Sequence, residues 1–210
     1  MAMLDRFRTV LVNPTEEEEL AREPLLKFSF YLSSRVIQLL DLGEEIKGKL
    51  DAGLSADRFD GRVLGNAGVL AWLWVLGAYE LVRTMCQPQN AFSPPILAKL
   101  LALKRRLELV RMPDAKMEPK GRNHPANSNR APPFWDLENQ DVILGDFENG
   151  SDRFRPLLEE FDEVMSAMTP ADVLLHHHET YKRPAEPAAA ADGGGRWAFP
   201  SSQVPQPRRC

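Results

Sequence analysis

The sequence predicts an all-α fold, an irregular bundle of about five or six helices with one long Pro/Asn-rich loop and a disordered C-terminal tail. Three observations lead to this prediction. Apolar residues recur at steps of three and four residues in several segments, which places them on one helical face. Cap residues followed by proline or by a glutamate mark several helix starts. From Lys182 onward, Pro, Ala, Gly and Ser make 16 of 29 residues, so the tail cannot bury enough apolar area to offset its ordering entropy.

These patterns divide the chain into an N-terminal arm at 1–14, a helical bundle domain at 15–181 and a tail at 182–210. Thr15 with Glu18 forms a capping-box pattern and predicts a short polar helix. A second helix of about four or five turns is expected from Pro24. Its apolar face consists of Leu25, Phe28, Leu32, Val36 and Leu39. Gly43 is expected to interrupt this helix, and residues 44–51 to continue as another short one.

The most apolar stretch runs from Ala67 to Tyr79, thirteen residues without a charge that include Trp72 and Trp74. A membrane span needs roughly twenty apolar residues. Because a wider window brings in Asn66 and Glu80, no membrane span is expected. A helix that is apolar on nearly all sides lies at the centre of a bundle, so we expect the helix at 69–82 to be covered by neighbours on every face.

The second half of the bundle starts with Ser93, whose hydroxyl is expected to cap a helix that begins at Pro94 and ends at Pro113. Residues 112–135 carry many prolines, glycines and asparagines and are expected to form the long surface loop. A short strand is arguable at 142–144, but one isolated strand does not imply a sheet. Two more helices are expected, one from near Pro156 and one from Thr169 to Tyr181.

The composition limits the classes of protein that remain open. With 43% hydrophobic and 27% charged residues among 210, the chain is neither collagen-like nor a disulfide scaffold. A net charge of −4 excludes a chain that binds nucleic acid over its whole surface by bulk attraction. Two cysteines, Cys86 and Cys210, cannot form a four-thiolate zinc site, and residues 1–14 contain no signal-peptide pattern. A cytoplasmic location is therefore expected.

One segment has the opposite charge from the whole. Residues 104–130 hold eight basic residues against three acidic ones, which would suit a phosphate-rich partner. The candidate binding residues are Lys104, Arg105, Arg106, Arg111, Lys116, Lys120, Arg122 and His124. Within this set, His124 could act as a general base and Arg122 could stabilise an anion, as metal-independent RNA cleavage requires. The alternative is that the basic segment faces residues 136–163, which hold ten acidic residues against two basic ones.

No other pattern points to catalysis. His176, His177 and His178 are adjacent, so on a helix they would point about 100° apart and could not converge on one metal ion. No catalytic residue, metal or cofactor is predicted. The sequence favours a non-enzymatic helical interaction protein, an adaptor or assembly subunit that binds a protein partner or itself through helix faces and its Trp197/Phe199 tail. The alternative is a nucleic-acid-binding protein or metal-independent nuclease that uses the basic segment.

Overall fold

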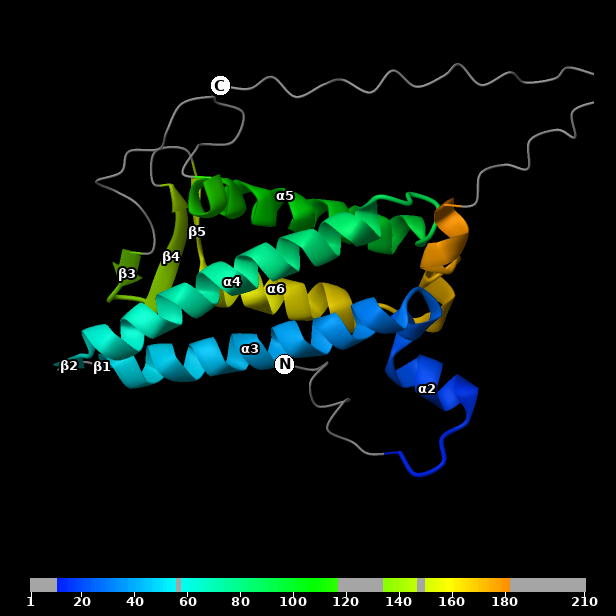
Figure 1. Ribbon diagram of the computed structural model, residues 1–210, viewed down its shortest axis with the longest axis horizontal. Helices are drawn as coiled ribbons and strands as arrows, with labels where there is room; N and C mark the ends of the chain where they lie inside the picture. Colours follow the sequence, from blue (N-terminus) through cyan, green and yellow to red (C-terminus); the bar gives the residue numbers. More distant parts are fainter. Residues whose placement is uncertain (1–10, 56–57, 117–133, 147–149, 182–210) are drawn as a thin grey trace, which may run out of the picture.

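Two long antiparallel helices joined by a tight hairpin form the front of the molecule (Figure 1). The structure is a computed structural model that describes residues 11–55, 58–116, 134–146 and 150–181. Within these ranges it contains α2 (Glu16–Arg22), α3 (Phe30–Gly53), α4 (Gly61–Cys86), α5 (Pro94–Lys116) and α6 (Phe154–Ser166). The fold is therefore mostly helical, as the sequence predicts, with five α-helices in the described residues; a small antiparallel sheet, which the sequence does not predict, accompanies them. The expected tail and most of the expected long loop lie outside those residues.

The N-terminal segment forms much as its caps predict. Thr15 accepts a hydrogen bond from the amide of Glu18, and the Glu18 carboxylate accepts one from the amide of Thr15, which completes the capping box of α2. The helix expected from Pro24 starts instead as a 3₁₀ turn, η1 (Pro24–Lys27), because Ser29 caps a new helix by accepting from the amide of Leu32. All five residues of the predicted apolar face are buried.

Gly43 does not interrupt the second helix, contrary to expectation, and α3 continues as one helix to Gly53. A Cβ atom added at Gly43 would lie 2.5 Å from Cδ1 of Leu158 on α6. The missing side chain therefore makes room for α6 to pack closely against α3. The chain then reverses in a hairpin of two short antiparallel strands, β1 (Leu54–Ser55) and β2 (Arg58–Phe59).

Asp60 starts α4 by accepting hydrogen bonds from the amides of Arg62 and Val63, both at 3.1 Å. Trp74, in the middle of α4, is fully buried, and its Nε1 donates to the carbonyl of Leu39 at 2.9 Å. The rings of Phe154 and Phe161 on α6 meet the Trp74 ring edge-on at 5.2 and 5.5 Å. The core thus lies behind α4, between it and α6.

Helix α5 begins at Pro94, as the sequence predicts, but its cap and its end differ from the prediction. The Ser93 hydroxyl donates to the carboxylate of Asp172 at 2.5 Å rather than capping the helix that begins at Pro94. Pro113 does not end α5, which continues to Lys116. Pro113 has no amide to donate to the carbonyl of Leu109, so α5 includes this proline at the cost of one backbone hydrogen bond near its end.

A sheet forms where the sequence indicates only an isolated strand. Strands β3 (Phe134–Asp136), β4 (Asp141–Asp146) and β5 (Gly150–Arg153) pair antiparallel in that order, and Trp135 lies opposite Val142. Val142 and Leu144 are buried beneath α5 and α6, which supplies the apolar contact that a short sheet needs. Near the start of β4, the Asp141 carboxylate accepts hydrogen bonds from the amides of Val142 and Arg155, so it caps the first turn of α6 from a distant strand. Burial raises the pKa of Asp141, and these hydrogen bonds oppose the rise.

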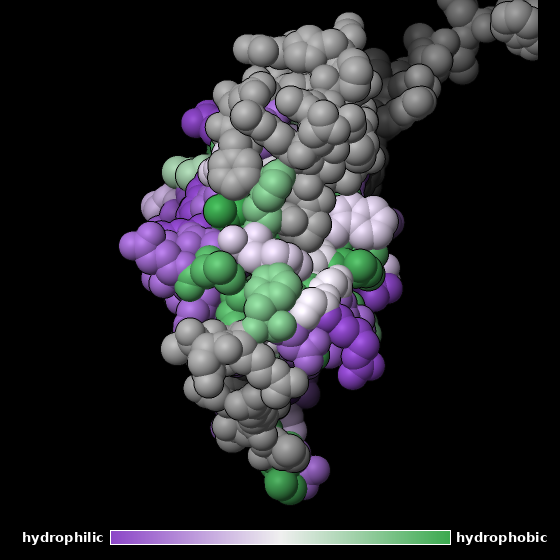
Figure 2. Space-filling view, turned by 90° about the vertical axis from the view of Figure 1, so that its left-hand side faces the viewer, coloured by the Kyte–Doolittle hydropathy of each residue, from purple (hydrophilic) through white to green (hydrophobic). Residues whose placement is uncertain are grey.

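The helix expected from Thr169 to Tyr181 is also absent. Two 3₁₀ turns occur there, η3 (Pro170–Asp172) and η4 (His177–Tyr181). Between them, Val173 is fully buried and forms a bridge with Phe92, so tertiary contact holds this segment extended. At the opposite end of the molecule, where the hairpin and the sheet lie, apolar side chains are scattered among polar ones (Figure 2), and Phe59 and Leu137 are exposed there.

Candidate interaction face on helix α4

The outer side of α4 carries apolar residues that nothing in the described structure covers. The exposed fractions are 54% for Val69, 40% for Trp72 and 45% for Leu73, and Leu76 is partly exposed. We call these four residues the α4 stripe. The prediction that neighbours cover this helix on every face is therefore wrong. Helix α4 packs against α3 on one side and α5 on the other, and it buries its inner side against α6, which leaves the outer side open (Figure 1).

The stripe belongs to a longer regular pattern. Steps of four and three residues alternate without a break through Arg62, Asn66, Val69, Leu73, Leu76, Glu80 and Arg83. Residues at this spacing share one face of a helix, and the spacing is that of a coiled-coil seam, with Val69, Leu73 and Leu76 as its apolar positions. Trp72 lies beside this face, next to Leu73. The four apolar residues therefore form the middle of a face that begins and ends with charged side chains.

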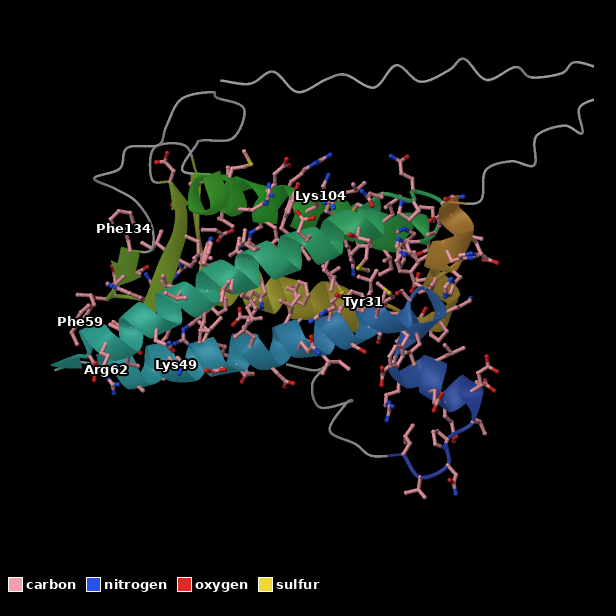
Figure 3. All side chains as sticks on the ribbon, in the orientation of Figure 1. Tyr31, Lys49, Phe59, Arg62, Lys104 and Phe134 are labelled. Atoms are coloured by element: carbon pink, nitrogen blue, oxygen red, sulfur yellow. The ribbon has the colours of Figure 1, made fainter. Side chains whose placement is uncertain are left out.

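The two ends of this face differ in their partners. At the start, Arg62 is exposed and forms no ion pair with any described residue; Figure 3 shows it beside Phe59 at the hairpin end of the molecule. At the other end, Glu80 accepts a hydrogen bond from Nε of Arg83 at 2.7 Å. Nη2 of Arg111 lies 3.6 Å from the other Glu80 oxygen, beyond hydrogen-bond distance. Glu80 is about half exposed, so this oxygen remains accessible to a further donor.

A groove runs beside the face where α3 and α4 separate. It has a volume of about 430 Å³, with Leu39, Leu42 and Leu81 among its apolar lining. Arg35 stands on the α3 wall, 4.8 Å from the ring of Tyr31, and Glu80 stands on the α4 wall. The polar groups in the lining of the groove are the side chains of Tyr31, Arg35, Gln38, Glu80 and Thr84, and no histidine or cysteine is among them. Its shape and lining suit the binding of an apolar surface rather than chemistry.

Part of the basic segment faces the acidic segment within the fold. Arg106 donates two hydrogen bonds to Asp152, at 2.6 and 2.8 Å, and a third to Glu160. These carboxylates raise the pKa of the Arg106 guanidinium, chiefly through the hydrogen bonds to Asp152. Arg106 therefore ties α5 to β5 and α6 and is not presented to an external phosphate.

The other candidate cations differ in whether they have partners within the fold. Arg111 lies over the ring of Tyr79 at 4.6 Å and close to Glu80, so it too has contacts within the fold. Lys104 and Arg105 form no ion pair with described residues; Arg105 is exposed, and Lys104 is partly buried on α5 (Figure 3). Lys116 lies in the last turn of α5, but its side chain is outside the described part of the structure. Lys120, Arg122 and His124, which include the proposed catalytic pair, also lie outside it.

His176, His177 and His178 do not lie in an α-helix, although the sequence predicts one from Thr169 to Tyr181. His177 lies in η4 with its ring 4.9 Å from that of Phe28, and its amide donates to the Phe28 carbonyl. The rings of His176 and His178 are 6.4 Å apart, and Nδ1 of His176 accepts from the amide of His178. Within the described ranges, no group of three or more His, Cys, Asp or Glu side chains could hold a metal ion.

One helix in the described ranges, α4, is long and apolar enough to cross a membrane by length and composition alone. Half of its apolar window is buried inside the fold. The core helix of a folded domain has the same length and composition, so this observation is weak evidence for a membrane span.

A count of apolar residues does not distinguish the α4 stripe, since residues 67–79 are apolar on nearly every side of the helix. The alternating steps of four and three between charged residues could have indicated it, because a helix buried on all sides has no reason to place charges at both ends of one face. No family model, curated protein or solved structure matches this chain, so its function is inferred from the chemistry of its own residues.

Proposed function

We propose that this protein is a non-enzymatic interaction protein, an adaptor or assembly subunit that binds a protein partner through the outer face of α4. The observation that carries the proposal is the exposure of Val69, Trp72 and Leu73 on consecutive turns of one helix. Contiguous apolar surface rimmed by polar residues is typical of protein interaction sites. Tryptophan is enriched in such sites because it buries a large area with few rotatable bonds.

Energetic reasoning supports the same proposal. Each Å² of apolar surface removed from water contributes roughly 25 cal/mol of favourable free energy. Burial of the α4 stripe against a protein partner is therefore more favourable than its exposure to solvent. The groove between α3 and α4 extends the apolar surface on one side, and Arg35 and Glu80 provide polar groups that can fix orientation.

The test compares Leu73→Asp with Leu137→Asp. Leu137 is 66% exposed in the turn between β3 and β4, so its variant adds the same charge away from the stripe. The association state of each variant is measured by light scattering, and proteins retained by the immobilised chain are identified by mass spectrometry. We expect L73D, but not L137D, to lose association. A wild-type chain that is monomeric and retains no partner would contradict the proposal.

A second candidate function rests on Lys104 and Arg105, which lack carboxylate partners in the described structure. With the cations at 116–124, they could bind the phosphates of RNA or DNA, and such binding would weaken steeply with salt. A gel shift at low ionic strength tests this, with R105E against the paired-residue variant R106Q. No retardation of RNA or DNA by the wild-type chain would exclude this candidate.

A further inference from the structure

We propose that the partner on the outer face of α4 is a second copy of this chain, with the two α4 helices packed antiparallel about a twofold axis. This inference rests on the proposed function, because it names the occupant of the same face. Two features of that face identify a second copy: its repeat and the order of its charges.

The repeat is the first feature. Alternating steps of four and three residues keep one seam facing a partner helix along the whole contact. The seam on α4 covers Arg62 to Arg83, about six turns, and its three central positions are Val69, Leu73 and Leu76. A partner helix can therefore lie along α4 for most of its length. α3 and α5 flank α4 without covering this side.

The order of the charges is the second feature. In a symmetric interface, the same patch of both subunits must be complementary to itself. Arg62 and Glu80 have opposite charge and are nine residues on either side of position 71. An antiparallel pairing centred there places Arg62 of each copy opposite Glu80 of the other, and the two pairs form together. The same register places Val69 opposite the second copy's Leu73 and Leu76 opposite its Asn66, so apolar contacts form at the centre, between the two charge pairs.

The local geometry is compatible with this pairing. Arg62 has no ion pair within the described structure, and the Glu80 oxygen that faces Arg111 has no hydrogen bond at 3.6 Å. Trp72 lies beside the seam and would cover its edge, one from each copy. A parallel pairing would instead place Arg62 against Arg62 and Glu80 against Glu80, which repel. The charges therefore select the antiparallel orientation.

The experiment uses charge reversal in the full chain with Cys210→Ser, which removes the terminal thiol. Sedimentation equilibrium measures the mass of the parent chain at concentrations up to about 500 μM. This range is needed because a single pair of helices buries less area than a stable complex, and we expect a Kd of about 1 to 100 μM. We expect the parent chain to dimerise. R62E and E80R are each expected to weaken the dimer about tenfold, because like charges then meet at both ends. An equimolar mixture of R62E with E80R should restore dimerisation, since opposite charges again meet at both ends.

Cross-linking checks the register. Variants V69C and L73C, each in the Cys210→Ser chain, should form a disulfide with each other under mild oxidation faster than either forms one with itself. Circular dichroism and thermal unfolding of all variants establish that each is folded, which matters most for E80R because it also removes the Arg83 pair.

The inference is overturned if the parent chain is monomeric over the whole range. It is also overturned if the dimer forms but neither reversal weakens it, or if mixing R62E with E80R fails to restore it. Two outcomes would show that the occupant of this face is not a second copy. In one, the parent chain is monomeric and binds a different protein that the L73D variant no longer binds. In the other, the parent chain is monomeric and binds anionic lipid vesicles. Loss of a different protein would leave the proposed function standing, whereas a monomer that binds nothing would end both.

Discussion

Trp72 and Trp74 are two positions apart on α4, yet one is exposed and the other is among the most buried residues of the protein. Two residues along a helix correspond to a turn of about 200°, so the two rings point in nearly opposite directions. Trp74 points inward, where it donates to Leu39 and contacts two phenylalanine rings. Trp72 points to the outer face. The same residue type therefore serves the core in one place and the surface in the other.

This contrast gives a prediction about stability. Trp74→Ala should lower the free energy of unfolding by about 3 to 5 kcal/mol, because it leaves a cavity and removes a buried hydrogen bond. Trp72→Ala, measured at a concentration where the chain is monomeric, should change it by less than about 1 kcal/mol. Urea denaturation followed by circular dichroism measures both. Equal losses in the two variants would contradict the assignment of inner and outer faces.

Cys86 provides a second prediction at this scale. Burial raises the pKa of its thiol to about 11, and the charge of Lys104 offsets this only in part. Since the thiolate is the reactive form, Cys86 should resist a thiol reagent at neutral pH while the chain is folded. The reaction is followed in the Cys210→Ser chain, with and without urea. Rapid labelling of the folded chain would show that Cys86 is not buried.

At the scale of elements, the contacts between helices depend on places where a side chain is missing or a cap comes from elsewhere. Gly43 lets α6 approach α3, and Asp141 on β4 caps the first turn of α6. Arg106 then joins α5 to both β5 and α6 through carboxylates. Asp141 on β4 and Asp152 on β5 thus fix the small sheet to the helices, which explains how strands of three to six residues persist.

Two glycines of α3 test the packing of this helix. A Cβ at Gly43 would overlap Leu158, whereas one at Gly48 would meet nothing within 4 Å. Gly48→Ala should therefore stabilise the fold by about 0.5 to 1 kcal/mol through helix propensity. Gly43→Ala gains the same propensity but costs about 1 to 3 kcal/mol in overpacking, so the net effect is destabilising. Thermal unfolding compares the pair; a stabilised G43A would show that α6 can move away without loss.

At the scale of the whole molecule, the segment after α6 closes one end of the bundle. The Asp172 carboxylate accepts hydrogen bonds from the hydroxyls of Ser93 and Thr169, and its carbonyl accepts one from the amide of Ser93. The amide of Leu174 donates to the carbonyl of Ala91, and Val173 is buried between them. The start of α5 and the C-terminal segment are therefore held together although about eighty residues separate them in sequence.

This closure predicts a dependence on pH. Hydrogen bonds from Ser93, and then from Thr169, hold the pKa of Asp172 below its ordinary value of 3.8. A carboxyl whose pKa is lower in the folded state stabilises the fold above the unfolded pKa, and this contribution disappears as the pH falls through the folded value. Asp172→Asn should therefore lower Tm by about 1 to 4 °C at pH 7, with a smaller difference as the pH falls below 4. A Tm difference that is constant between pH 7 and pH 2 would contradict this role.

The sequence by itself determined the helical class, the capping box at Thr15 and the buried face of Leu25, Phe28, Leu32, Val36 and Leu39, because these depend on residues within a few turns of each other. The tertiary structure decided the rest. Gly43 continues a helix, Val142 joins a sheet and Val173 stays extended because distant residues pack against them. The same holds for function: the sequence shows that residues 67–79 are apolar on nearly all sides and that charged residues bound one of these faces, but the packing of α3, α5 and α6 decides that this side stays open. Local propensity cannot specify that side, since burial depends on which surfaces the whole chain brings together.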